Sequence, residues 1–249
     1  MNLKTTMHKT MKQSLTTLTA CLLLCAHVFA AAAEDGKHLF ILSGQSNMKR
    51  LDPAISFTPT VEASLGKENV IVVKDAEGGK PIVRWYKAWK PAKEGMPAKG
   101  IFGDLYDRLM VSVNAAIQGK HIKTVTFVWM QSESDALKGQ AAVYEASLKG
   151  LIEQLRTDMK RKDINFVIGR ITDYQMENAD WVTLRKAQVA ATEADPSGAW
   201  VDTDDLNDMK NKKGEIINDI HFSADGYRLL GERFAQKAIE LVKKQTDLD

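Results

Sequence analysis

A serine in a polar turn is the first residue of this sequence that could act as a nucleophile. The apolar run Phe40–Leu42 leads directly into Ser43-Gly44-Gln45-Ser46-Asn47-Met48. A serine on such a turn can present its hydroxyl to a ligand, and its own backbone N–H can stabilise a developing oxyanion. Turns of this composition also occur without any chemical role. Ser46 is therefore a candidate nucleophile that still needs a base.

A histidine near the C-terminal end could be that base. His221 lies in Asn218-Asp219-Ile220-His221-Phe222-Ser223, where Asp219 precedes it by two residues. His38 opens a predicted strand and His121 lies among lysines, so both are expected to be structural or solvated. An imidazole close to a carboxylate is a typical general base near neutral pH. We therefore expect His221 to be the base, with Asp219 as one candidate for its supporting acid.

A third polar segment supplies a second candidate acid and an oxyanion donor. It is Gln131-Ser132-Glu133-Ser134-Asp135, and it follows the apolar run Phe127–Met130. The Gln131 side chain can donate an N–H to an oxyanion, and Glu133 can orient an imidazole. The serine and aspartate at the end of this segment are equally consistent with capping a helix.

A glycine-containing loop follows the predicted strand Asn69–Lys74. Its paired glycines, Gly78 and Gly79, allow backbone N–H groups to approach a ligand closely, although a plain loop would look the same. Arg84 and Trp85 come a few residues later. A guanidinium and an aromatic face are suited to binding a sugar, and packing of the loop is the alternative.

The alternation of short apolar runs with helical patterns predicts an α/β domain with a parallel sheet. Strands are expected at His38–Leu42, Asn69–Lys74, Thr124–Met130, Asn165–Gly169 and Ala199–Val201. Helices are expected at Leu105–Ile117, Tyr144–Met159, Trp181–Ala194 and Ala224–Val242, with long loops at Asp52–Pro59 and Gly78–Gly103. Ligands of open parallel sheets bind beyond the carboxyl ends of the strands, where most of the candidate residues lie.

The first 33 residues are typical of a secretory signal peptide. Lys4, Lys9 and Lys12 precede an apolar stretch from Leu15 to Phe29, and small residues follow at 30–33. We expect a single domain at 34–249 that is exported to the periplasm or secreted. A lipid anchor at a cysteine of the leader, Cys21, is the alternative.

The composition excludes several classes of function. The chain has 34 basic and 32 acidic residues, and its leader contains three of the lysines, so the mature chain has a net charge of about −1. No basic stripe for nucleic acid is present, and nothing implies a stable protein partner. Both cysteines, Cys21 and Cys25, lie in the leader. Disulfides, thiolate catalysis and cysteine metal sites are therefore not expected after cleavage.

Several motifs in the same order resemble the SGNH hydrolase superfamily, and within it the sialate O-acetylesterase-like group that includes the acetylxylan esterases of carbohydrate esterase family six. The likeness spans nearly the whole mature chain. It rests on the motifs Gly44-Gln45-Ser46-Asn47-Met48, Gly78-Gly79-Lys80-Pro81-Ile82 with Trp85, Trp129-Met130-Gln131-Ser132-Glu133-Ser134-Asp135 and Asp219-Ile220-His221-Phe222-Ser223-Ala224-Asp225-Gly226-Tyr227. The resemblance implies a three-layer α/β/α, flavodoxin-like fold with a five-stranded parallel sheet, and hydrolysis without a metal or organic cofactor.

The resemblance also implies a role for each candidate residue. Ser46 would be the nucleophile and His221 the base, and the oxyanion hole would comprise the backbone of Ser46, Gly79 and the Gln131 side chain. The chain departs from the family at two positions. Asn218 stands where an aspartate is usual, which leaves Asp219 and Glu133 as alternative supporting acids. Ser132 stands where glycine is usual, and its Cβ would crowd the oxyanion pocket if the backbone there needs a positive φ.

The expected activity is the removal of O-acetyl groups from a carbohydrate, either an acetylated polysaccharide or a sialic acid. Two alternatives remain open. A catalytically impaired homologue would bind carbohydrate without releasing acetate, and an esterase for other acyl chains would need a long apolar pocket.

Overall fold

The computed structural model describes residues 36–91 and 100–247. The expected signal peptide, with its alternative lipid-anchor site at Cys21, lies outside these residues. Within the described part of the chain, no helix is long and apolar enough to cross a membrane.

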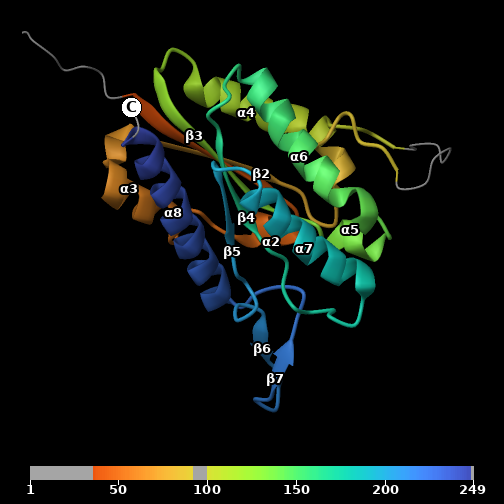
Figure 1. Ribbon diagram of the computed structural model, residues 1–249. Coiled ribbons are helices and arrows are strands. Elements are labelled where there is room, and N and C mark those ends of the chain that lie inside the picture. Colours follow the sequence, from red (N-terminus) through yellow and green to blue (C-terminus); the bar gives the residue numbers. More distant parts are fainter. Residues whose placement is uncertain (1–35, 92–99, 248–249) are drawn as a thin grey trace, which may run out of the picture. The chain divides into compact units, whose positions relative to one another are not determined.

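A five-stranded parallel sheet forms the centre of the domain (Figure 1). Its strands are β1 (Lys37–Gly44), β2 (Val70–Ala76), β3 (Ile122–Met130), β4 (Asn165–Gly169) and β5 (Gly198–Val201), in the spatial order β2-β1-β3-β4-β5. Gly44 at the end of β1 pairs with Ala76 on one side and Met130 on the other. The carboxyl ends of these three strands therefore meet at one level. The predicted fold class is confirmed.

Helices cover both faces of this sheet (Figure 1). On one face α3 (Phe57–Leu65) packs against α8 (Ala224–Thr246), and the other face carries α4 (Asp104–Ile117), α6 (Ala141–Asp158) and α7 (Ala179–Glu193). The apolar stripe predicted on α4 is buried at Leu105, Leu109 and Val113. Burial of such stripes against the two faces of the sheet is the main source of stability in this architecture.

The helix α3 corrects the sequence-based expectation of a long loop at Asp52–Pro59. Pro59 is the third residue of α3. The first N–H groups of a helix have no partner within the helix, so proline costs no hydrogen bond at this position. Pro59 is therefore compatible with a helix, although a proline in this segment had favoured the prediction of a loop.

Three further short elements were also not anticipated, and two of them lie close to the candidate residues. They are α2 (Ser46–Arg50) and the antiparallel pair β6 (Asp208–Lys210) and β7 (Ile216–Asn218). The helix expected at Ser134 or Asp135 is α5 (Glu133–Leu137), but its N-cap is Ser132, so both residues lie inside the helix. The expected loop at Gly78–Gly103 contains a 3₁₀ turn at Ile82–Arg84, and residues 92–99 of it lie outside the description.

Candidate active site

Ser46 is held at the carboxyl edge of the sheet by the tight turn that follows β1. Gly44 has φ +144°, and a Cβ at this position would lie 2.0 Å from the Met130 carbonyl oxygen, so only glycine fits. The next backbone N–H, that of Gln45, donates to the same carbonyl at 2.9 Å. Ser46 then begins α2 and is half-buried. The turn thus fixes the serine backbone against the end of β3.

The glycine loop lies directly beside this serine. A Cβ built on Gly78 would lie 3.8 Å from the Ser46 Cβ. Gly79 has φ +66°, a left-handed conformation that glycine adopts without strain, and a Cβ there would face open space. In the described part of the chain, the backbone N–H groups of Ser46 and Gly79 have no acceptor. Both remain available to an oxyanion.

Asn47 connects the serine turn to two distant segments. Its fully buried side chain donates from Nδ2 to Glu133 Oε1 at 2.9 Å and to the Ile220 carbonyl at 3.0 Å. Its Oδ1 accepts from the Tyr227 hydroxyl at 2.9 Å. The residue after Ser46 is therefore tied to the residue before His221. Asn47 and Tyr227 had no predicted role, although both stand inside motifs that were singled out in the sequence.

Asp219 is the carboxylate that contacts His221. Its Oδ1 lies 3.7 Å from His221 Nδ1 and accepts the His221 backbone N–H at 2.8 Å. Partial burial is the largest influence on the imidazole and lowers the pKa of His221, the charge of Arg50 lowers it further, and Asp219 opposes both. His221 is therefore mostly neutral at pH 7, the form that a general base requires.

Glu133, the alternative acid, is engaged elsewhere. Its two carboxylate oxygens accept from Asn47 Nδ2 at 2.9 Å and from the Ser132 backbone N–H at 3.0 Å. Burial raises the pKa of Glu133, and these hydrogen bonds partly offset the effect. Among the described residues, Asp219 and not Glu133 forms the contact with the imidazole of His221.

Asn218, which stands in place of the aspartate that the resemblance implies, binds a neighbouring loop. Its Nδ2 donates to Asp173 Oδ1 at 2.9 Å, and its Oδ1 accepts from the Asn207 side chain. Asn207 also donates to the Asp219 carbonyl at 2.9 Å. These amides hold the segment before His221 without contributing a charge to it.

The Gln131 side chain does not have a free donor in this arrangement. It is fully buried, and Nε2 lies 2.5 Å from Asp135 Oδ2, 3.1 Å from the Lys80 carbonyl and 3.3 Å from Gln45 Oε1. The Ile82 N–H donates to the same Asp135 oxygen at 2.9 Å, and burial raises the pKa of Asp135 to about 6. Gln131 thus fastens the glycine loop, and its role as an oxyanion donor stays a prediction that requires a different orientation of the amide.

Ser132 has the positive φ at which its Cβ was expected to crowd the oxyanion pocket. Its φ is +155°, its side chain is completely buried, and its hydroxyl has no hydrogen-bond partner among the described residues. A side chain in this region of φ is strained, and an unpaired buried hydroxyl adds to the cost.

The two expected sugar-binding residues are engaged within the protein. Trp85 is only 1% exposed, donates from Nε1 to Ser43 Oγ at 3.0 Å and packs edge-to-face on Trp129 at 5.1 Å. It is a core residue, so its prediction as a sugar contact is wrong. Arg84 makes two hydrogen bonds of 2.6 Å to Asp104, which occupy its guanidinium fork. This pairing holds Arg84 within the protein, and a contact between Arg84 and the sugar stays a prediction.

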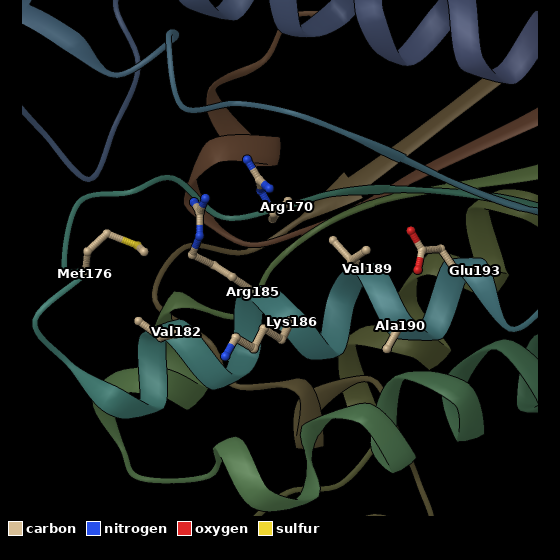
Figure 2. Close-up of a pocket in the computed structure, with 8 residues that line it drawn as sticks. All are labelled: Arg170, Met176, Val182, Arg185, Lys186, Val189, Ala190 and Glu193. Atoms are coloured by element: carbon tan, nitrogen blue, oxygen red, sulfur yellow. The ribbon is translucent and has the colours of Figure 1, made fainter.

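A pocket along α7 does not include any of the candidate residues (Figure 2). It is lined by Arg170, Met176, Val182, Arg185, Lys186, Val189, Ala190 and Glu193. Arg170 and Arg185 both bind Asp204, at 2.9 and 2.7 Å. Both arginines of the pocket are thus paired with a carboxylate, and the residues that line the pocket include no serine or histidine.

A family description of carbohydrate esterases, "sialic acid-specific acetylesterase", matches residues 49–240. This chain belongs to that family. The family membership makes the protein a carbohydrate O-acetylesterase and confirms the resemblance inferred from the motifs. The matched region contains Gly79, Gln131, Asp219 and His221, and it begins three residues after Ser46.

Solved structures have the same fold as this carbohydrate esterase. A protein from Arabidopsis thaliana has a TM-score of 0.61 and 20% identity, over 82% of this chain and 98% of that one. A carbohydrate acetylesterase from Xanthomonas citri has a TM-score of 0.63 and 18% identity, over 83% of this chain and 56% of that one. The structure named NanS has a TM-score of 0.60 and 14% identity, over 84% of this chain and 98% of that one. No curated protein matched the sequence.

Proposed function

We propose that this carbohydrate O-acetylesterase acts through Ser46 as nucleophile, His221 as general base and Asp219 as the acid that supports it. The observation that carries the proposal is the pair of hydrogen bonds from Asn47 to Glu133 and to the Ile220 carbonyl. They bring the residues beside the nucleophile and the base together across the chain.

The first half of the reaction transfers the acetyl group to Ser46. Asp219 faces Nδ1 of His221, which favours the tautomer with its proton on Nδ1 and a free lone pair on Nε2. Nε2 removes the Ser46 proton as Oγ bonds to the acetyl carbon, and the carbonyl oxygen becomes an oxyanion. His221 then protonates the sugar oxygen as its bond to carbon breaks.

Water completes the cycle on the acetyl-enzyme. His221 takes one proton from the water as its oxygen attacks the acetyl carbon, and returns a proton to Ser46 Oγ as acetate leaves. The N–H groups of Ser46 and Gly79 stabilise both oxyanions. Each such donor typically contributes about 100- to 1000-fold to the rate. Turnover through these two donors alone is therefore expected to be slower than in an esterase with a third.

Acetate release from acetylated xylan and from O-acetylated sialic acid tests this proposal. Release is expected from at least one of them, and Ser46→Ala should abolish it. Ser64→Ala, an exposed serine on α3, is the matched control and should behave as the native protein. Release that persists in Ser46→Ala would overturn the mechanism. Saccharide binding without release, even from an aryl acetate, would favour the catalytically impaired carbohydrate-binding protein.

We also propose that the chain is exported and loses residues 1–33. The proposal is supported by the order of basic, apolar and small residues in the leader. The protein recovered from the periplasm or medium should begin at Glu34, as its mass and N-terminal sequence would show. A fatty-acylated N-terminus at Cys21 would instead indicate the lipid anchor, and an intact chain in the cytoplasm would contradict both.

A further inference from the structure

Arg50 differs from every other arginine of this protein. All nine arginines lie in the described part of the chain. Eight of them have a carboxylate within 4.0 Å; for example, Arg84 lies 2.6 Å from Asp104, and Arg233 lies 2.6 Å from Asp205. Arg50 has none among the described residues, and it is exposed. Within residues 36–91 and 100–247, the guanidinium fork of Arg50 thus has no anionic partner.

This arginine lies beside the catalytic groups. It follows Ser46 by four residues on α2, so the two side chains are on the same side of the helix, about one turn apart. The charge of Arg50 acts on both His221 and Tyr227 and lowers the pKa of each group. Arg50 therefore borders the position of a substrate whose acetyl group reaches Ser46.

The other cation of the same helix turn is already neutralised. Lys49 contacts Glu77 at 3.0 Å, and Glu77 also lies 3.6 Å from Arg108. Of the two cations on α2, Arg50 is therefore the one without a carboxylate partner among the described residues. A planar guanidinium with free donors matches the geometry of a carboxylate better than any other side chain does.

We propose that Arg50 binds a carboxylate of the substrate, so that the esterase prefers O-acetylated sugars that carry an acid group over neutral ones. This inference rests on the proposed function of Ser46 and His221. A sialic acid and a uronic acid offer the same carboxylate chemistry, and either fits the proposal. The neutral sugars of acetylated xylan lack the group that Arg50 would recognise.

Matched substrates test the proposal with the purified chain. One pair is 9-O-acetyl-N-acetylneuraminic acid and its C1 carboxamide, and the other is a mono-O-acetylated methyl glucuronoside and its carboxamide. The native protein should hydrolyse the acid of at least one pair with a kcat/KM roughly 10- to 100-fold above that of its amide. The pair that shows the preference identifies the class of acidic sugar.

Variants at two adjacent positions locate the origin of the preference. Arg50→Gln should bring the ratio of acid to amide close to one, mainly through KM for the acid, and Arg50→Lys should retain part of it. Lys49→Gln removes the neighbouring paired cation and should keep the native ratio. In Arg50→Gln the pKa of His221 should also rise, which moves the acid limb of the pH profile upward; a merely structural role would not have this effect.

Three results would overturn the inference. They are equal rates for acid and amide in the native protein, a preference that survives in Arg50→Gln, and a loss in Arg50→Gln that is the same for both substrates. If no substrate releases acetate, the proposed function fails, and calorimetry with N-acetylneuraminic acid and its carboxamide decides separately on Arg50. Binding that requires both the carboxylate and Arg50 would support its role, and binding that does not would refute it.

Discussion

Ser132→Gly is expected to stabilise the protein, because Ser132 has two unfavourable features in the folded state. Its φ of +155° is a conformation that glycine adopts freely, and relief of such strain is worth about 1 kcal/mol or more. Its buried hydroxyl has no partner among the described residues, and removing it contributes about 1 kcal/mol. The greater freedom of glycine in the unfolded chain costs about 0.4–1 kcal/mol. The net gain is about 1 kcal/mol.

Thermal unfolding of the two proteins measures this gain. For a domain of roughly 150–250 residues, about 1 kcal/mol raises Tm by about 2–4 °C. The same substitution at Ser147 is the control, since Ser147 is buried within α6 and its hydroxyl donates to the Val143 carbonyl at 2.7 Å. Ser147→Gly should lower Tm, because glycine in a helix interior costs about 1 kcal/mol. A Tm that is unchanged or lower in Ser132→Gly would refute the argument from strain.

Three further outcomes follow from the site. The acid limb of the pH profile of kcat/KM should lie below pH 6.5, because the pKa of His221 is lowered and activity is lost only as pH falls through that pKa; a limb above 6.5 would contradict a partly buried base. Asp219→Asn should reduce kcat by roughly 100-fold or more, whereas Glu133→Gln should mainly lower Tm. Steady-state kinetics and calorimetry on both variants measure these effects, and a larger loss of kcat in Glu133→Gln would make Glu133 the supporting acid. Gly44→Ala should prevent stable folding, since its Cβ would overlap the Met130 carbonyl, and a soluble variant with native circular dichroism would show that the turn can relax.

The sheet was predictable because each of its strands is a short apolar run between polar segments. All five strands appeared within a few residues of their expected bounds, from Lys37–Gly44 to Gly198–Val201. The pair β6 and β7 was not predictable, since each strand has three residues and Ile216 and Ile217 are exposed. Burial leaves a periodic pattern in a sequence, and an exposed hairpin leaves almost none.

The location of the site was predictable, but the direction of several side chains was not. The rule that parallel strands end at one edge was sufficient to bring together the segments of Ser46, Gly79 and Gln131. Whether the Gln131 amide faces the substrate or the Lys80 carbonyl depends on contacts with segments far away in the chain. The prediction of Trp85 as a sugar contact was wrong for the same reason. An aromatic residue in a loop has the same sequence signature whether it packs inward or faces solvent.

The hydrogen bond from Asn47 to Ile220 spans 173 positions of the chain. Because the ribosome produces the chain from its N-terminus, Ser46 is made long before His221, the base proposed for it. A growing chain that contains only the first strands therefore cannot assemble the proposed pair. Under the proposed mechanism, deacetylation requires that the segment before His221 has first packed against the serine turn.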